Sequence, residues 1–215
     1  DGNLFPKMHQ APTVAAAKMM KKLMEYMPAD ALDYDFDKAN TAFAQGNAAY
    51  TVNWNAYMPY VLDPSSSAVS DKVAFCGTPG GPEGRYSALG GWVQGISSQS
   101  DNKDAAFQLI QYLSGKDRGV EYAMNGGSVA RFSTANDPTV VAKFPFYPIL
   151  MDVLKGYTGF GQYRPWPEIE KTMETYFHKV MLGEDPESTL LKGAQQVYVQ
   201  AQRGGYNPGA TGDKP

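Results

Sequence analysis

The stretch Leu89-Gly90-Gly91-Trp92-Val93-Gln94-Gly95-Ile96 carries most of the information about the fold and function of this chain. Glycine allows backbone angles and close approaches that a Cβ atom would prevent, and here a glycine pair directly precedes an indole. An indole offers a large, flat apolar face with one polar group. The stretch therefore favours contact between Trp92 and a flat, hydroxyl-rich ligand such as a sugar ring. The alternative is an ordinary core tryptophan.

On both sides of this stretch the chain follows an α/β pattern that contains more helix than strand. Apolar periodicity and end signals predict helices over residues 12–27, 35–45, 100–113, 118–124, 137–154, 166–181 and 185–198. Strands are predicted at 49–53, at 73–76 and in the glycine–tryptophan stretch. Three strands are too few for a self-sufficient sheet beside so many helices, so partner strands are missing from this chain.

Two of these segments predict where the core lies. Helix 12–27 has an apolar face that should point inward, and its lysines and Glu25 lie opposite. This face consists of Ala16, Met19, Met20, Leu23, Met24 and Met27. Cys76 ends the apolar run Val73-Ala74-Phe75 and is expected to be a buried, inert thiol.

Composition and charge narrow the range of possible functions and partners of the chain. The 215 residues include 43% hydrophobic side chains, and the formal charge of -3 with no basic stripe argues against nucleic acid as a partner. One cysteine excludes an internal disulfide, and two separated histidines make a metal centre improbable, so neither metal nor cofactor is expected. No apolar run reaches transmembrane length. Asp1-Gly2-Asn3 is typical of an internal start, which leaves export open.

Several motifs occur in a fixed order along the chain. They are residues 43–53 (FAQGNAAYTVN), 90–92 (GGW), 102–107 (NKDAAF), 126–131 (GGSVAR), 165–169 (PWPEI) and 183–187 (GEDPE). Together they resemble the C-terminal half of the extracellular solute-binding proteins of sugar ABC transporters. The resemblance extends over residues 1 to 203.

The resemblance implies a periplasmic-binding-protein-like fold of type II, with two α/β lobes joined by a hinge. Residues 1–86 and 140–203 would form the C-terminal lobe. Residues 87–139 would cross over and complete the N-terminal lobe, and 204–215 would form a tail. The first half of a full protein would then be absent, so the chain is either a fragment or is completed by a separate chain that supplies the N-terminal half.

Eight residues are candidates for ligand contact. Asn53, Trp54 and Tyr57 lie around the end of the predicted strand 49–53, where ligands gather in open α/β sheets, although turn duty would explain Asn53 equally well. The resemblance adds Arg131, which could instead form a surface salt bridge. It also adds Arg164 and Trp166, whose alternative is a hydrophobic lid on a helix start. Gly91 and Trp92 complete the set.

The predicted function is a non-catalytic, periplasmic or extracellular receptor. It would capture a sugar or polyol between two lobes and deliver it to a membrane permease, and any lipid anchor would lie outside this chain. The alternative is a carbohydrate-active enzyme, a glycoside hydrolase or lyase, with Glu168 or Asp152 as acid or base. Glu168 and Glu170 point to different faces of their helix and make a poor catalytic pair by themselves.

Overall fold

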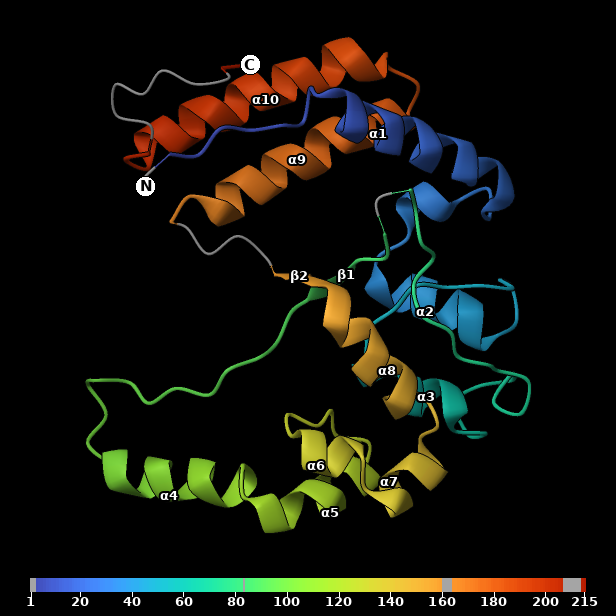
Figure 1. Cartoon of the computed structure of the whole chain (residues 1–215), viewed down its shortest axis with the longest axis vertical. Helices are drawn as coiled ribbons and strands as arrows, with labels where there is room; N and C mark the ends of the chain where they lie inside the picture. The colour runs from blue at the N-terminus through green and yellow to red at the C-terminus, as the bar shows by residue number, and fades with distance from the viewer. Residues whose placement is uncertain (1–2, 83, 160–163, 207–213) are drawn as a thin grey trace. The chain divides into compact units, whose positions relative to one another are not determined.

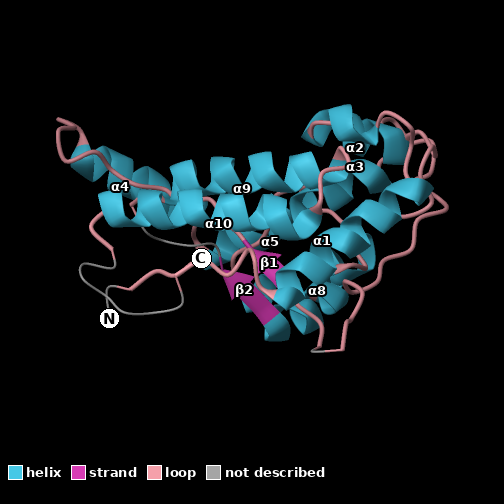
Figure 2. Ribbon diagram, turned by 90° about the horizontal axis from the view of Figure 1, so that it is seen from above, coloured by secondary structure: helices cyan, strands magenta, loops and turns pink. Residues whose placement is uncertain are grey.

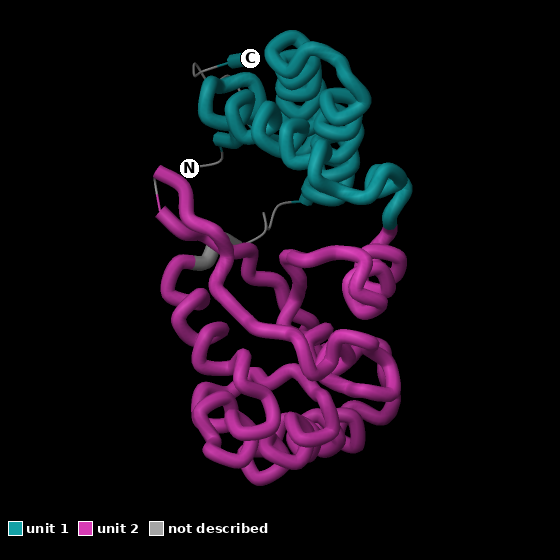
Figure 3. The backbone as a smooth tube through the Cα atoms, turned by 90° about the vertical axis from the view of Figure 1, so that its right-hand side faces the viewer, with its two compact units in different colours: residues 1–34, 161–215 teal, residues 35–160 magenta. Residues whose placement is uncertain are grey.

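A computed structural model gives the fold of the chain and describes residues 3–82, 84–159, 164–206 and 214–215. The chain divides into two compact units, coloured separately in Figure 3. Unit 1 contains residues 1–34 and 161–215, and unit 2 contains residues 35–160. The lobe boundaries expected from the sequence are not tested by this division and stay a prediction. Residues 207–213 of the expected tail lie outside the described residues.

Unit 1 is helical in its described part. It contains α1 (Ala11–Leu23), the 3-10 turns η1 (Met24–Tyr26) and η2 (Ala31–Asp33), α9 (Trp166–Met181) and α10 (Pro186–Arg203). Helices α1, α9 and α10 lie side by side and contact one another (Figure 1). Asp185 caps α10, because its carboxylate accepts a hydrogen bond from the backbone N–H of Ser188 at 2.9 Å. The predicted helices 166–181 and 185–198 are thereby confirmed.

The core of unit 1 lies between these three helices. Its buried members are Met8, Val14, Ala17, Ile169, Val180, Leu190, Ala194 and Val197. Helix α9 contributes Ile169 and Val180 to this core, and Met173, Phe177 and Met181 pack against it.

The inward face predicted for α1 is wrong. The helix buries Val14 and Ala17, whereas Met19, Met20 and Leu23 are exposed. Small side chains allow α1 to approach α9 and α10 closely, and Lys18 reaches Glu187 on α10 at 2.9 Å. Hydrophobic periodicity identified a real face of the helix. It did not identify the face that the neighbouring helices cover.

Unit 2 consists of short helices and one small sheet (Figure 2). Its strands β1 (Ser87–Leu89) and β2 (Tyr157–Gly159) pair in parallel, with Ser87 opposite Tyr157. Its helices are α2 (Phe36–Ala44), α3 (Met58–Leu62), α4 (Lys103–Leu113), α5 (Gly119–Met124), α6 (Phe132–Ala135), α7 (Pro138–Lys143) and α8 (Tyr147–Val153), with 3-10 turns η3 (Asn55–Tyr57), η4 (Lys116–Arg118) and η5 (Leu154–Gly156).

The core of unit 2 is aromatic. Tyr147 is almost fully buried and packs against Phe144 and Phe146, with ring centroids 6.4 and 4.5 Å away. Ala123, Ala135 and Val140 complete the buried cluster. This cluster joins helices α5 to α8, which therefore form the packed part of the unit.

Two of the predicted strands are wrong, and the third, in the glycine–tryptophan stretch 89–96, overlaps the observed strand β1 (Ser87–Leu89) only at Leu89. Residues 49–53 and 73–76 form no strand, and in the described part of unit 2 neither of them pairs with another segment. An extended segment without a ladder partner does not become a strand, whatever its propensity. Cys76, predicted to be buried, is exposed in the same segment. Within the described residues, none of the helices combines the length and the apolarity that a bilayer crossing requires.

Candidate ligand-binding site

Four aromatic rings of unit 2 lie together and form what we call the ring cluster: Phe36, Trp54, Tyr57 and Tyr60. Phe36 begins α2, and its ring centroid lies 5.0 Å from that of Trp54 and 6.2 Å from that of Tyr57. Tyr57 stacks on Tyr60 at 5.0 Å. The indole of Trp54 keeps 61% of its surface exposed. The cluster thus presents a broad apolar face to solvent.

Neutral polar groups border the ring cluster. The amide nitrogen of Asn53 donates to the side-chain oxygen of Asn40, and the amide oxygen of Asn53 accepts from the backbone N–H of Trp54 at 2.8 Å. The Asn55 amide donates to the hydroxyl of Ser128 at 2.6 Å. This last bond joins the segment 53–57 to the motif 126–131.

Tyr57 is the titratable group of the ring cluster with a displaced pKa. Burial raises the pKa of its phenol to about 12 from the ordinary 10.0, and the neighbouring Tyr60 adds to the shift. The hydroxyl donates to the backbone carbonyl of Asn40 at 2.7 Å. Tyr57 therefore stays uncharged at neutral pH and acts as a fixed hydrogen-bond donor.

Arg131 is held by the backbone of its own unit. Its guanidinium donates through Nε and Nη2 to the carbonyl oxygen of Ser114, at 3.3 and 2.8 Å. This partner is neither a ligand group nor the carboxylate that the surface salt bridge would have required. The planar fork of Arg131 is used to join the start of α6 to the end of α4.

Trp92 lies away from the ring cluster. Its side chain is 99% exposed, and none of the ring contacts found among the described residues involves it. A Cβ atom added at Gly91 would meet nothing within 4 Å. Among the described residues, therefore, no protein group makes the close approach to the backbone that the glycine pair was predicted to allow. Its predicted role in ligand contact stays a prediction.

Trp166 and Arg164 belong to unit 1. Trp166 packs against the core of that unit and lines a cavity of about 350 Å³ together with Phe5, Met173 and Phe177. Arg164 is exposed. The packing of Trp166 agrees with the alternative given above, a hydrophobic lid on the helix start. Its indole also lines this cavity.

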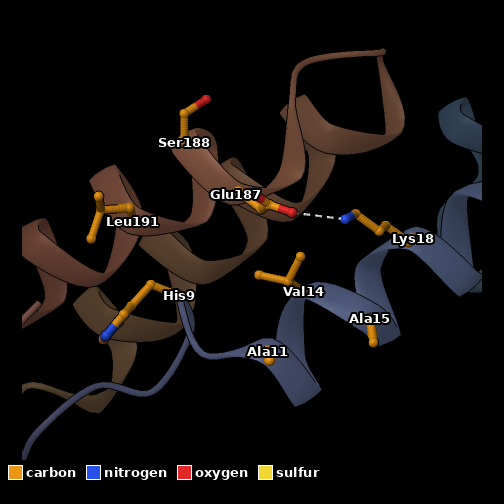
Figure 4. A pocket seen from close by; sticks show the side chains of 8 residues that line it. All are labelled: His9, Ala11, Val14, Ala15, Lys18, Glu187, Ser188 and Leu191. Carbon is orange, nitrogen blue, oxygen red and sulfur yellow. Dashed lines mark hydrogen bonds and ion pairs between the residues drawn. The ribbon is translucent and has the colours of Figure 1, made fainter.

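A second cavity of unit 1, of about 500 Å³, lies between α1 and the start of α10. Its lining residues are His9, Ala11, Val14, Ala15, Lys18, Glu187, Ser188 and Leu191. Figure 4 shows the Lys18–Glu187 ion pair spanning it. Of its eight lining residues only His9 carries a ring, so it offers no wide stacking surface for a sugar. It contains none of the predicted site residues.

Metal and acid–base chemistry find little support in the described residues. Among them no group of three or more histidine, cysteine or acidic side chains could hold a metal ion. Asp152 pairs with Lys155 at 2.9 Å, and this hydrogen bond and charge lower the pKa of the Asp152 carboxyl, which disfavours a role as general acid. Asp152 belongs to unit 2 and Glu168 to unit 1.

Sequence reasoning found Asn53, Trp54 and Tyr57 but missed Phe36, Asn40 and Tyr60. A signal for the first two existed. Phe36 and Asn40 are four residues apart on a predicted helix, so they share one face. An asparagine on a buried helix face requires a polar partner, and this requirement points to a nearby amide or hydroxyl.

The family follows from a comparison of the sequence with known families. The model of the bacterial extracellular solute-binding proteins matches residues 1–118, more than half of the chain. The chain belongs to this family. Among the relatives of the solute-binding chain, a probable amino-acid ABC transporter periplasmic-binding protein of Sinorhizobium fredii is 30% identical over 168 residues. A probable ABC transporter-binding protein of Deinococcus radiodurans is 30% identical over 134 residues.

Solved structures extend the likeness to the whole solute-binding chain. An ABC transporter solute-binding protein of Agrobacterium radiobacter K84 in complex with ribitol is 28% identical, with a TM-score of 0.78 over 91% of this chain. Maltose-bound MalE3 of T. maritima is 25% identical, with a TM-score of 0.84 over 93%. The fold is therefore that of the type II periplasmic binding proteins, as the sequence predicted.

The solute-binding chain spans only part of the length of these proteins. It covers 37% of the S. fredii relative and 30% of the D. radiodurans relative. It covers 51% of the ribitol-bound structure and 53% of the maltose-bound structure.

Proposed function

We propose that this chain contributes a sugar- or polyol-binding surface to the solute-binding component of an ABC transporter. The observation that carries the proposal is the ring cluster of Phe36, Trp54, Tyr57 and Tyr60, bordered by neutral amide groups. Aromatic faces suit the apolar C–H faces of sugars, and amides both donate and accept hydrogen bonds to hydroxyls. Ribitol and maltose are the ligands of the two solved neighbours.

The proposal has to be weighed against the relative named for amino-acid transport. A free amino acid carries a carboxylate and an ammonium group, and its receptor needs fixed charges to pair with both. The hydrogen bonds around Trp54 and Tyr57 join amides, hydroxyls and backbone groups. Arg131, the cation in the predicted set from this unit, is bound to Ser114. These partners favour an uncharged, hydroxyl-rich ligand.

Stacking would dominate the affinity. Burying one aromatic side chain stabilises a complex by about 1.5–3 kcal/mol, whereas a neutral hydrogen bond contributes about 0.5–1.5 kcal/mol. Trp54, which is more exposed than its neighbours Phe36 and Tyr60, has the most surface to bury. The ring cluster would therefore set the affinity, and the amides would select the stereochemistry of the hydroxyl groups.

The second half of the proposed binding site would come from residues 87–139 together with an N-terminal half. Helix α4 supports this role, because none of its residues is buried and Phe107, Leu109 and Tyr112 are more than half exposed. Large apolar side chains that stay exposed along a helix indicate a surface built to be covered. Trp92 and Gly91 precede this helix and would meet the ligand from the N-terminal lobe.

The complete receptor would work outside the cytoplasm and deliver its ligand to a membrane permease without converting it. The extracellular family model and the periplasmic-binding relative support the location. The absence of conversion is inferred from the family and from the solved neighbours, which are binding proteins. Lobe closure would be driven by contacts that the ligand makes only in the closed state.

Binding measurements on the native protein test the proposal. Calorimetry with ribitol, maltose, monosaccharides and a set of amino acids should give saturable binding for a polyol or sugar and none for the amino acids. Trp54→Ala should weaken binding more than tenfold, because about 1.5–3 kcal/mol of stacking is lost. Tyr26→Ala, on unit 1, is the control, because Tyr26 is even more exposed than Trp54 (78% against 61%), and it should leave the affinity unchanged. Saturable binding of an amino acid alone would refute the ligand class.

A further inference from the structure

Asn40 is a buried amide on helix α2, and it forms hydrogen bonds with Asn53 and Tyr57, next to and within the ring cluster. Only 4% of its surface is exposed, in a helix whose other buried residues are Ala42 and Ala44. A buried polar side chain without partners destabilises the fold, so its position calls for an explanation. Both of its described partners lie in the segment 53–57.

The first contact is made by the Asn40 side chain. Its oxygen accepts a hydrogen bond from the amide nitrogen of Asn53, and the amide oxygen of Asn53 accepts from the backbone N–H of Trp54 at 2.8 Å. The two bonds form a chain from α2 to the peptide unit that carries the indole. The side chain of Asn53 has both of its polar atoms engaged in this chain.

The second contact is made by the Asn40 backbone. Its carbonyl oxygen accepts the hydroxyl of Tyr57 at 2.7 Å. A carbonyl oxygen has two lone pairs, so this bond is compatible with a helical hydrogen bond to the same atom. Asn40 thus accepts the Tyr57 hydroxyl directly, and through Asn53 it is linked to the backbone N–H of Trp54.

Phe36 contacts the two rings whose segment these bonds hold. It lies one helical turn before Asn40 on α2, and its ring contacts Trp54 at 5.0 Å and Tyr57 edge-on at 6.2 Å. The polar contacts fix the backbone of segment 53–57 against α2, and Phe36 then determines how far each ring can turn. Without the Asn40 amide, the indole would keep its apolar neighbour, but the Asn53 side chain that accepts from the Trp54 N–H would no longer be tied to α2.

We propose that the side chain of Asn40 is a positioning group that orients Trp54 for ligand contact through Asn53, beside the Tyr57 hydroxyl that the Asn40 backbone carbonyl holds. This inference rests on the proposed function, because Trp54 contacts a ligand only if the ring cluster is the binding surface. Asn53 serves as the link between Asn40 and Trp54, and its predicted contact with the ligand stays a prediction.

The test uses fluorescence of Trp54 in the native protein with every other tryptophan replaced by phenylalanine. Asn40→Leu removes the acceptor at nearly constant volume, and Asn40→Asp retains an oxygen acceptor. Asn40→Leu should shift the Trp54 emission and raise its quenching by acrylamide. It should weaken binding of the best polyol or sugar probe about tenfold, the loss that accompanies one misplaced hydrogen-bonded contact. Asn40→Asp should restore part of both signals.

Gln200→Leu is the matched control. Gln200 is likewise a buried amide, and its Nε2 donates to Thr172 at 2.8 Å within unit 1. This substitution also removes a buried side-chain hydrogen bond, and it should leave Trp54 emission, quenching and ligand affinity unchanged. The comparison separates loss of a buried hydrogen bond from loss of ring orientation.

Asn53→Ala breaks the same chain from the more accessible side and serves if Asn40→Leu does not fold. It removes the bond to Asn40 and the bond to the Trp54 N–H, so it should change the Trp54 signals at least as much as Asn40→Leu. Adding Asn40→Leu to Asn53→Ala should change them no further, since the link to α2 is already gone. Unchanged Trp54 emission and quenching in the folded variants would overturn the assignment of Asn40. Failure of the wild-type protein to bind any polyol or sugar would instead overturn the proposed function.

Discussion

Replacing Tyr57 with phenylalanine removes one hydroxyl and leaves the ring in place. The hydroxyl donates to the Asn40 carbonyl at 2.7 Å, while the ring keeps its contacts with Phe36 and Tyr60. A neutral hydrogen bond contributes about 1 kcal/mol to stability. We therefore expect the free energy of unfolding of Tyr57→Phe to fall by about 1 kcal/mol at neutral pH, because stacking is retained.

The same hydroxyl makes this difference depend on pH. Burial raises the pKa of folded Tyr57 to about 12, whereas the unfolded phenol titrates near 10.0. Between these values the unfolded state has lost the proton and the folded state still holds it, so stability falls as pH rises. The stabilisation is complete below pH 10 and is lost by about pH 12. Phenylalanine has no proton to lose, so the gap between wild type and variant should narrow across this window.

Urea unfolding of unit 2, followed by near-UV circular dichroism of the aromatic rings, measures both effects. Tyr60→Phe is the control, because the Tyr60 hydroxyl makes no hydrogen bond within the part of the chain that the structure describes. It should be as stable as wild type at neutral pH. The reasoning is refuted if Tyr57→Phe and Tyr60→Phe unfold at the same urea concentration, or if the gap for Tyr57→Phe widens above pH 10.

Three further predictions test the fold. Leu190→Ala should lower the free energy of unfolding by about 2–5 kcal/mol, because Leu190 is 0% exposed. Leu191→Ala is the control and should cost clearly less, because Leu191 is 37% exposed. Equal losses in urea titrations would contradict the assignment of Leu190 to the core. Asp35→Ala should lower the free energy of unfolding by about 1 kcal/mol, because it removes the cap of α2. Asp37→Ala removes no cap and should be near neutral. A larger loss for Asp37→Ala than for Asp35→Ala would show that the helix does not start at Asp35. Cys76 should react with a thiol reagent in folded protein, and labelling only after denaturation would show that it is buried after all.

Local signals in the sequence were sufficient for most helices. Asp185 before Pro186 predicted the start of α10, and Asp35 with Gly46 bracketed α2, where the structure has the cap and the positive φ of 81°. Caps and left-handed glycines act within one turn of chain, so these predictions needed no knowledge of neighbours. Helix α3 was missed, since Met58–Leu62 is a single short turn with an internal proline.

Faces and strands could not be predicted in the same way. The methionine face of α1 is exposed, because helices α9 and α10 cover the side with Val14 and Ala17. The apolar residues of α4 have no described cover at all. Segment 49–53 has the composition of a strand but no partner to pair with. In each case the outcome depends on what lies next to the segment in space.

The candidate site shows the same division. Residue type singled out Trp54, Tyr57 and Asn53, because indoles, phenols and amides suit a hydroxyl-rich ligand, together with their place at the end of a predicted strand 49–53 that the structure does not form. The structure added Phe36 and Asn40, brought to these residues by helix α2, and assigned Arg131 to the Ser114 carbonyl. The sequence by itself determined the family, the helix ends and the chemistry on offer, since these depend on residue identity and on neighbours within a turn. Only tertiary structure decided which side chains are buried, which amides are already engaged and which rings meet, because those outcomes depend on contacts between segments that are distant in the chain.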